Sequence, residues 1–376
     1  MIRSLVEQQE LACTVSQEAL LSALTSVSRL TPRLSASPQL CIEVQDDMLA
    51  VSYATVDTRL SVRVEARVTY SGSCTVPTKM LLDCVKRLPE GQPVTLQVKS
   101  SVLWLHAGTR LFLLKEIAQG ASPLTLPESV AQTFSIESRM LHAGLKEVLF
   151  AAATESRHPA LTALYLHVEE ECMHLVAANP YRLACRTVEL EEQQTGCDIT
   201  ALVPTAPLRL LASVLPKEGQ VAVTLQEESI AFHTSGLDLT TRLLSDVFPI
   251  ETVSACIPSI FSAQFTLSRM HLLHTLSALS PITSDDPILK LSYAEGRVFF
   301  HARSSSLGEA RDEVEAETLG EGDIFFNVTR LFDLCRAVTA RTFTFFLTDY
   351  RHPVRIVPDS RTDYCYVLMP MNVSRW

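Results

Sequence analysis

Apolar residues recur at helical spacing in three stretches of the chain that resemble one another. The stretches cover residues 13–24, 134–145 and 265–276, and their matching leucines are Leu20, Leu141 and Leu272, which lie 121 and 131 residues apart. Each stretch opens with a few alternating residues, and each has a Ser, Thr or Glu near the expected helix start. The pattern therefore predicts a short strand followed by an amphipathic helix, three times along the chain.

A second motif repeats with nearly the same period. Residues 74–98 return as residues 201–225 and, more weakly, as 325–347, with Val76, Val203 and Phe326 at matching positions 127 and 123 residues apart. Solenoid repeats are only about 20–50 residues long, so this period indicates three domains of one fold. We expect two helices in each domain and place the domains at residues 1–127, 128–254 and 255–376.

The remaining sequence has the pattern of strands. Residues 61–68, 164–168 and 289–293 alternate between apolar and polar side chains, as half-buried strands do. Gly91, Gly219 and Gly296, together with Pro77 and Pro204, stand where turns or strand ends are expected. A chain of 376 residues has room for two to four domains of about 100–200 residues each. The fold class predicted is α+β, with three repeated domains.

Composition narrows the class of protein. The hydrophobic content of 47% is ample for globular cores, and no run of about 18 apolar residues predicts a membrane span. Residues 1–10 lack the apolar stretch of a secretory signal, so we expect a short terminal extension there. The ten cysteines are scattered, without a Cys-x-x-Cys pair. This favours a reduced, cytoplasmic protein without a disulfide framework.

The net charge is −10, but basic residues gather on or beside the predicted helices. They could be ordinary solvated charges, or they could bind a nucleic-acid backbone without reading bases. The predicted helix at residues 16–27 carries no Lys or Arg, which weakens the second interpretation in that part of the chain. The basic residues concerned are Lys79, Lys86, Arg87, Arg139, Lys146, Arg209, Lys217, Arg269, Arg330 and Arg336.

Signatures of catalysis are missing from the sequence. There is no Gly-rich phosphate loop, no Gly-x-Ser-x-Gly and no His-Glu-x-x-His. His271 and His274 have the spacing of a metal pair, but they fall in a stretch better explained as an amphipathic helix. The acidic residues at 284–286 and 312–315 are more typical of solvated loops than of acid/base pairs. We therefore expect a protein that is not an enzyme, with no cofactor and no metal.

Several short motifs, in order, resemble the beta subunit of bacterial DNA polymerase III, the replicative sliding clamp. They lie at residues 76–83, 88–91, 181–184, 247–249, 326–328, 347–349 and 366–371, and the resemblance extends over residues 11–371. It implies three domains, each with antiparallel sheets outside and two helices inside. Two protomers would then meet head to tail in a closed ring.

The resemblance also implies the function. Such a homodimer encircles double-stranded DNA without regard to sequence and tethers the replicative polymerase subunit for processivity. A clamp loader and other proteins with a clamp-binding motif are further implied partners, and no membrane is involved. The acidic outer surface and basic lining expected of such a ring suit the overall charge of −10.

A pocket for a partner peptide is a further implication. Apolar side chains, including two methionines, would form an adaptable groove between the second and third domains. The alternative is that residues 366–371 are simply a final core strand. The pocket candidates are Leu161, Ala178, Pro180, Tyr181, Arg182, Leu183, Pro249, Pro353, Val367, Leu368, Met369, Pro370 and Met371.

Two other sets of residues follow from the resemblance. Leu111, Phe112 and Leu279 match positions that pack between protomers, although exposed apolar residues at element ends are equally often ordinary core contacts. Loops that touch DNA in this family would add three residues to the basic set. These are Arg33, Arg157 and His158.

The chain departs from the family pattern in three places. Residues 178–183 read Ala-Asn-Pro-Tyr-Arg-Leu where the family has Thr-Asp-Gly-His-Arg-Leu, and Pro180 predicts a different loop geometry there. Residues 250–254 lack the basic residue common at the pocket rim, and residues 372–376, ending in Trp376, extend beyond the usual terminus. An alternative function is therefore a specialised clamp-fold scaffold with altered partner choice.

Overall fold

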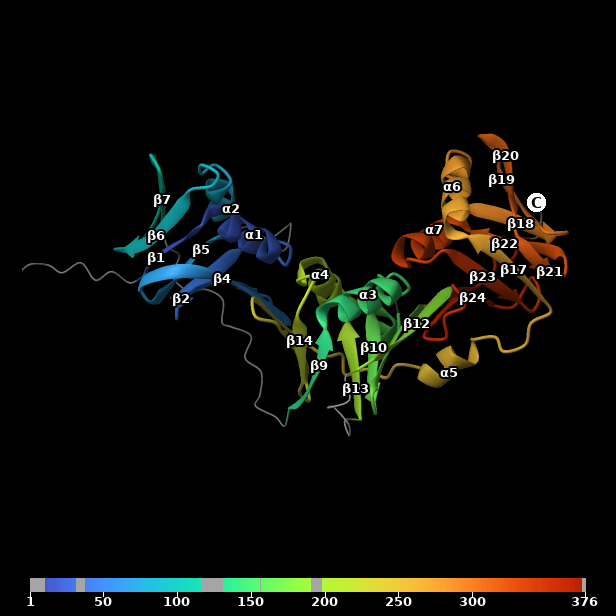
Figure 1. Ribbon diagram of the computed structural model, residues 1–376, viewed down its shortest axis with the longest axis horizontal. Helices are drawn as coiled ribbons and strands as arrows, with labels where there is room; N and C mark the ends of the chain where they lie inside the picture. The colour runs from blue at the N-terminus through green and yellow to red at the C-terminus, as the bar shows by residue number, and fades with distance from the viewer. Residues whose placement is uncertain (1–10, 32–37, 116–130, 156, 191–197, 374–376) are drawn as a thin grey trace, which may run out of the picture. The chain divides into compact units, whose positions relative to one another are not determined.

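The structure is a computed structural model that describes residues 11–31, 38–115, 131–155, 157–190 and 198–373 (Figure 1). The chain divides into two compact units. The first unit comprises Met1–Ser138 and Leu210–Leu243, and the second comprises Arg139–Arg209 and Leu244–Trp376. This division falls within the middle third of the chain, so the three domain boundaries expected from the repeats stay a prediction.

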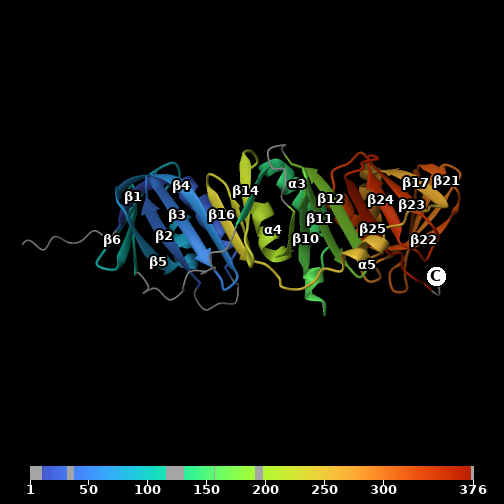
Figure 2. The same ribbon diagram turned by 90° about the horizontal axis from the view of Figure 1, so that it is seen from below.

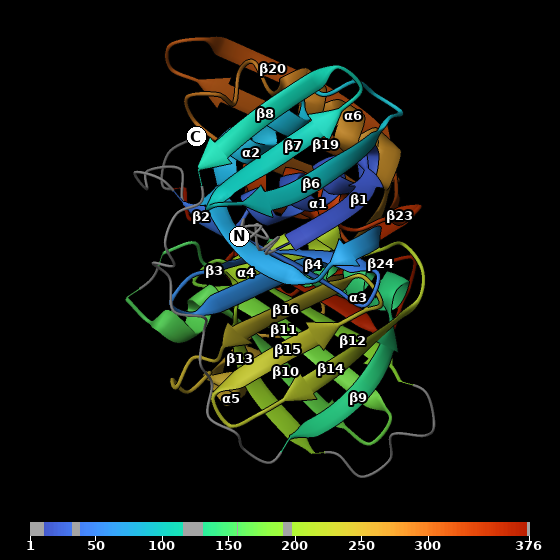
Figure 3. The ribbon, with the colours of Figure 1, turned by 90° about the vertical axis from the view of Figure 1, so that its left-hand side faces the viewer.

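The first unit is built on one antiparallel sheet of 12 strands (Figure 3). The main strand order is β8-β7-β6-β1-β4-β16-β15-β14-β9, and β2, β3 and β5 extend it beside β4. Its elements are β1 (Leu11–Ser16), α1 (Gln17–Ser28), β2 (Gln39–Gln45), β3 (Met48–Ala54), β4 (Thr58–Tyr70), β5 (Gly72–Pro77), α2 (Thr78–Val85), β6 (Pro93–Lys99), β7 (Val102–Ala107), β8 (Arg110–Lys115), β9 (Gln132–Glu137), β14 (Gln220–Leu225), β15 (Ser229–His233) and β16 (Leu237–Arg242).

Local sequence explains the helices of this unit. The Ser16 hydroxyl accepts a hydrogen bond from the Ala19 backbone N–H at 3.5 Å and so caps the start of α1. Leu20, Leu24 and Val27 recur at helical spacing and are fully buried where α1 packs on α2, β3 and β4. Because α1 buries its apolar stripe in this way, the sheet and the two helices share one core.

The second unit contains one sheet of nine strands and one of four. The orders are β13-β10-β11-β12-β25-β24-β23-β17-β21 and β20-β19-β18-β22. The first residue of α3 and the second half of α4 are assigned to the first unit, and the rest of both helices to the second. The elements are α3 (Ser138–Leu149), η1 (Pro159–Thr162), β10 (Ala163–Glu169), β11 (Cys172–Asn179), β12 (Arg182–Glu189), β13 (Ile199–Pro204), α4 (Thr205–Val214), α5 (Ile250–Ala255), β17 (Ala263–Ser268), α6 (Arg269–Leu279), β18 (Ile288–Ala294), β19 (Arg297–Ser304), β20 (Gly308–Glu315), β21 (Glu317–Leu319), β22 (Gly322–Asn327), α7 (Val328–Ala337), β23 (Thr342–Leu347), β24 (Val354–Pro358) and β25 (Tyr364–Leu368).

One strand pair joins distant parts of the chain in this unit. β12 pairs antiparallel with β25, which places Leu183 opposite Val367 in the middle of the nine-stranded sheet (Figure 2). On one face of this sheet α3 packs so closely that a Cβ on Gly144 would lie 2.9 Å from Leu175 Cδ1. Since side chains alternate along a strand, Val176 points to the opposite face. That opposite face carries the candidate site.

The repeats identified in the sequence correspond to real structural repeats. The helix pairs are α1 and α2, α3 and α4, and α6 and α7, so the α+β fold with two helices in each third is confirmed. Gly91, Gly219 and Gly296 have positive φ angles of 70°, 100° and 79°, as their turns require. The short helix α5 and strand β21 were not predicted. No helix in the described ranges is both long and apolar enough to cross a membrane.

Candidate functional site

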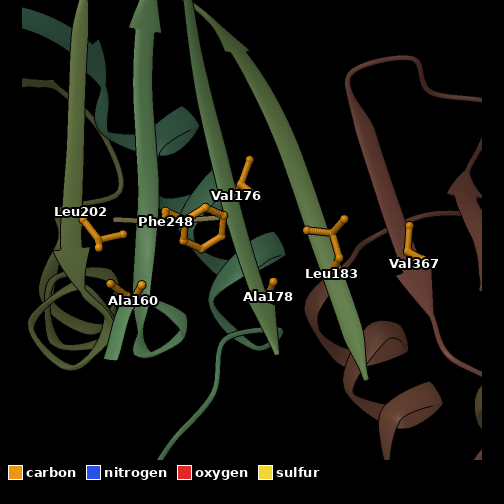
Figure 4. Close-up of a cluster of buried hydrophobic side chains, with 8 residues drawn as sticks. Ala160, Val176, Ala178, Leu183, Leu202, Phe248 and Val367 are labelled. Atoms are coloured by element: carbon orange, nitrogen blue, oxygen red, sulfur yellow. The ribbon is translucent and has the colours of Figure 1, made fainter. Parts of the chain in front are cut away.

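Eight apolar side chains gather on the face of the nine-stranded sheet that lies opposite α3 (Figure 4). We call them the apolar cluster. The strands β10, β11, β12, β13 and β25 supply six of them, η1 supplies Ala160, and the loop before α5 supplies Phe248. The cluster consists of Ala160, Ala163, Val176, Ala178, Leu183, Leu202, Phe248 and Val367.

Strand register brings these side chains into one row. Ala178 of β11 lies opposite Leu183 of β12, and Leu183 lies opposite Val367 of β25. Cys185 and Cys365 form the next pair along the same face and pack against the cluster. The row therefore crosses from the middle third of the chain into the last third without interruption.

The chain itself covers much of the apolar cluster. The ring of Phe248 stacks on Tyr165 with a centroid distance of 5.3 Å, and Ile250 and Val253 of α5 and Ile257 beyond it pack against the cluster. None of the residues of α5 is buried, and its first turn has no side-chain cap. Because α5 is short and makes few buried contacts, its packing against the cluster is of low local stability. A ligand for the cluster would bind beside α5 or displace it.

The tip of the β11–β12 hairpin borders the cluster. Asn179 Oδ1 accepts hydrogen bonds from the backbone N–H groups of Tyr181, at 2.9 Å, and Arg182, at 3.1 Å. Pro180 and Tyr181 form the two-residue loop between the strands, and neither has a positive φ. The side-chain amide thus fixes a turn in which proline is acceptable, because the missing proline N–H is not one of the donors used.

Two cationic contacts fasten this hairpin tip to α7. The guanidinium of Arg330 lies 4.1 Å from the centre of the Tyr181 ring, and Arg182 Nη1 donates to Asp333 Oδ2 at 2.6 Å. Burial lowers the pKa of Arg330 from its usual value. Tyr181 keeps 53% of its surface exposed, so its ring remains available at the edge of the site.

The end of β25 forms the other border. Tyr366, Val367 and Leu368 are buried strand residues, as the core-strand alternative expected. Beyond them, the Met369 N–H donates to the Tyr181 carbonyl at 2.9 Å and the Met371 N–H donates to the Phe325 carbonyl at 2.8 Å. Residues 369–371 are half-buried and lie between a core strand and the surface.

The structure divides the predicted pocket residues into three groups. Ala178, Leu183 and Val367 belong to the cluster and Leu161 packs against it, whereas Arg182 and Leu368 form an opposed pair that points to the other face. The other predicted residues lie at exposed or half-buried positions, near strand ends or, for Pro249, directly before α5. They are Pro180, Tyr181, Pro249, Pro353, Met369, Pro370 and Met371.

Sequence reasoning missed several contributors to this face. Tyr165, Val176, Cys185, Phe248 and Cys365 were not predicted, although alternation along β11 and β12 from Ala178 and Leu183 could have indicated Val176 and Cys185. The apolar side chains of α5 were also missed. No sequence signal indicated that residues 250–257 fold back onto the cluster.

Most of the predicted DNA-contacting residues have exposed side chains on or beside helices. Several of them also make contacts within the protein: Arg209 Nη2 donates to the Leu149 carbonyl at 2.9 Å, Arg269 Nε donates to the Cys335 carbonyl at 2.8 Å, and Arg330 lies on Tyr181. Arg87 Nη1 donates to the Asp83 carbonyl at 2.9 Å, and Arg336 lies over the Phe332 ring. Arg33 lies outside the described residues. The exposed residues are Lys79, Lys86, Arg87, Arg139, Lys146, Arg157, His158, Arg209, Lys217 and Arg336.

The predicted protomer contacts divide in the same way. β8 is an edge strand on which Leu111 is 47% exposed, Leu113 is 54% exposed and Phe112 is half-buried. Leu279 is only 2% exposed. It packs in the core of its own protomer, and its assignment to the protomer contact stays a prediction.

The described residues contain no group of three or more His, Cys, Asp or Glu side chains arranged to hold a metal ion. His271 and His274 are both exposed on α6.

Comparison with known proteins covers nearly the whole chain. Family models for the N-terminal, central and C-terminal domains of the DNA polymerase III beta subunit match residues 11–125, 135–250 and 254–372. The beta sliding clamp of Caulobacter vibrioides is 24% identical over 372 residues, which are 96% of this chain and 99% of the relative. The beta sliding clamp of Synechococcus elongatus is 26% identical over 376 residues, covering 95% and 98% of the two chains.

Solved structures show the same fold. The beta subunit of Thermotoga maritima aligns with a TM-score of 0.86 at 22% identity, over 97% of this chain and all of that one. The Pseudomonas aeruginosa clamp bound to griselimycin aligns with a TM-score of 0.87 at 23% identity, over the same shares. Since all three domain models match in order, the chain belongs to the DNA polymerase III beta subunit family, the sliding clamps, which are non-catalytic processivity factors.

Proposed function

We propose that this protein is a DNA sliding clamp that encircles duplex DNA as a head-to-tail homodimer and tethers the replicative polymerase in the cytoplasm. The observation that carries the proposal is the ordered match of all three clamp domain models over residues 11–372. The repeated pairs of helices, each pair packed on antiparallel sheets, support it. A protein of this kind acts by topology and needs no catalytic group.

Two open sheet edges support the head-to-tail ring. β8 ends the first unit's sheet and carries Arg110, Lys115 and the exposed Leu111 and Leu113, whereas β20 ends the four-stranded sheet. The exposed residues of β20 include Glu309, Glu313 and Glu315. An unpaired strand edge is a template for pairing, and opposite charges on two edges favour their association. In a two-subunit ring, β8 of each protomer would pair with β20 of its partner.

Exposed basic side chains support the contact with DNA. Lys79, Lys146 and Arg336 project from α2, α3 and α7, and Lys86, Arg87 and Lys217 follow the ends of α2 and α4. Contacts of Lys and Arg with phosphates carry no base information, so they hold a duplex while allowing it to move. Helix α1 has no basic residue, so α1 contributes little to this contact.

The apolar cluster and its borders are the proposed peptide pocket. Partner segments would place large apolar side chains on Leu183 and Val367 and cover the exposed Tyr181. Polymerase, clamp loader and other clamp-binding proteins are the proposed partners. Among relatives, the Pseudomonas aeruginosa clamp is described as bound to griselimycin, and one from C. crescentus holds a polyethylene glycol at a candidate beta-motif tethering region.

A processivity assay tests the proposed function. Primer extension on a long single-stranded template would be run with the cognate polymerase and clamp loader, with a trap that captures any polymerase that dissociates. The expected result is a marked increase in product length per binding event when this protein and ATP are both present. Unchanged product length with a well-folded protein would contradict the proposal.

A peptide titration tests the pocket separately. A fluorescein-labelled Gln-Leu-Ser-Leu-Phe peptide should bind saturably, and the Met369→Ala, Met371→Ala double variant should lose that binding. Val56→Ala, at an exposed apolar residue of the first unit, is the matched control and should bind like the unaltered protein. Equal binding by the double variant would place the peptide elsewhere.

A further inference from the structure

Arg355 borders the apolar cluster on the side of the last third of the chain. It lies in β24 directly opposite Val367 of β25, with Phe346 of β23 opposite it on the other side. Residues opposite one another in a sheet project from the same face, so Arg355 and Val367 share the face that carries the cluster. Burial raises the pKa of the Cys365 thiol, which packs against the cluster, and the positive charge of Arg355 opposes that rise.

The partners of Arg355 set it apart from its arginine neighbours. Arg182, Arg186 and Arg361 each pair with an Asp or Glu carboxylate. In the described ranges, Arg355 forms no ion pair. Its Nε is buried without a hydrogen-bond partner, as is that of Arg182, so the missing carboxylate is what distinguishes Arg355. A half-buried guanidinium in this state has lost part of its hydration without gaining a counter-charge, which is costly.

A carboxylate would complete this site. The guanidinium fork matches a carboxylate in geometry, and charge-assisted hydrogen bonds of this kind are roughly twice as strong as neutral ones. The neighbouring cluster supplies apolar surface but no carboxylate for the guanidinium. A bound segment that combined apolar side chains with one acidic side chain would therefore satisfy both parts of the surface.

We propose that Arg355 is a specificity-determining residue that makes the pocket select partner peptides bearing an aspartate or glutamate beside their apolar anchor residues. The proposal rests on the peptide pocket put forward above and adds the chemistry of its ligand. Residues 250–254, which border the cluster on its other side, contain one acidic residue, Glu251, and no basic one. The cation that would bind the acidic side chain of the peptide is thus Arg355 of β24.

Paired peptides that differ by one charge test this inference. Fluorescence polarisation would compare Gln-Leu-Asp-Leu-Phe with Gln-Leu-Asn-Leu-Phe, and Gln-Leu-Ser-Leu-Phe-Asp with Gln-Leu-Ser-Leu-Phe-Asn, all C-terminally amidated. We expect the acidic member of at least one pair to bind about five- to tenfold more tightly at low salt. Arg355→Gln should bring that ratio to about one, and Arg355→Lys should keep part of it.

A control variant and the pattern of peptide binding separate a failure of the Arg355 proposal from a failure of the pocket proposal. Arg297→Gln removes an exposed arginine of β19 that pairs with Glu313, and it should leave the ratio unchanged. Neutral peptides that bind while neither acidic member is preferred would overturn the role of Arg355 but not the pocket. The role would also be overturned by a preference that persists in Arg355→Gln. If no peptide binds the folded protein, the pocket itself is refuted, and the inference with it.

Discussion

Arg361 binds the carboxylate of Glu147 in a bidentate manner, through both Nη atoms of its guanidinium group. Arg361 Nη1 lies 3.0 Å from Glu147 Oε1, and Nη2 lies 3.2 Å from Oε2. Arg186 Nε approaches Glu147 Oε2 at 3.2 Å, and Arg361 Nε also bonds Asp363 Oδ1 at 2.9 Å. This partly buried cluster ties α3 to the turn before β25, next to the β12–β25 pairing that underlies the apolar cluster.

We expect Glu147→Gln to destabilise the protein strongly. Glu147 is 7% exposed, and its replacement would leave Arg186 and Arg361 with the more exposed Asp363 as their remaining shared counter-charge. Breaking a buried ion pair by removing one partner costs about 3–5 kcal/mol. Urea unfolding followed by circular dichroism would measure the loss. Glu313→Gln, in the exposed pair with Arg297, should cost less than about 1 kcal/mol, and similar losses in the two variants would contradict the account.

Charge on the β8 edge should separate the protomers. Leu111→Asp with Leu113→Asp would bring two carboxylates against the acidic edge of β20 and remove the apolar contact. We expect sedimentation velocity at micromolar concentration to change from the mass of a dimer to 41.6 kDa. Val56→Asp, an exposed apolar position in the loop between β3 and β4, should leave the dimer intact. A dimer that survives the double substitution would exclude β8 from the interface.

Removing one phosphate contact should change the salt dependence of DNA binding. Lys146→Ala on α3 should lower the slope of log K against log salt by about one, without altering any sequence preference. Anisotropy of a labelled duplex between 50 and 200 mM salt would measure it. Lys290 of β18 forms an ion pair with Asp323, with 2.8 Å between Nζ and Oδ2. Lys290→Ala is therefore the control and should not change the slope. An unchanged slope in Lys146→Ala would remove that residue from the DNA contact.

Alkylation of the thiols should depend on burial and on pH. Burial raises the pKa of Cys13, Cys185 and Cys335 to about 12, so at pH 8 only about one in ten thousand of these thiols is ionised. Cys256 is exposed next to α5. Mass spectrometry after brief iodoacetamide treatment should find Cys256 modified first and those three protected, with protection weakening as pH rises toward 12. Early modification of Cys185 would mean that the apolar cluster is open.

Local repetition made the architecture predictable. Leu20, Leu141 and Leu272 at matching positions are at most 1% exposed, because each repeat buries the same helical stripe against its own sheet. A strand and helix that are adjacent in sequence leave a periodic signal, and three copies of that signal reinforce one another. The helix pairs could therefore be predicted from pattern alone.

The site was less predictable because its contacts are distant in sequence. Leu183 meets Val367 only through the β12–β25 pairing, and Glu147 meets Arg361 across 214 residues. Alternation of apolar and polar residues shows which side chains of a strand share a face, but not which strand pairs with it in the sheet. The lack of a carboxylate partner for Arg355 could not be predicted for the same reason, since it depends on residues distant in sequence. The burial of Leu279 was also not predictable, because an apolar residue at a helix end has the same sequence pattern whether it is buried or exposed.

Retention on circular DNA tests the central claim most directly. The protein would be loaded onto a closed circular duplex by the clamp loader with ATP, separated from free protein by gel filtration, and followed before and after a single restriction cut. A sliding ring should stay with the circle at salt concentrations that abolish ordinary phosphate binding, and should leave once the DNA has ends. Equal retention on circular and linear DNA, or none on either, would contradict the account.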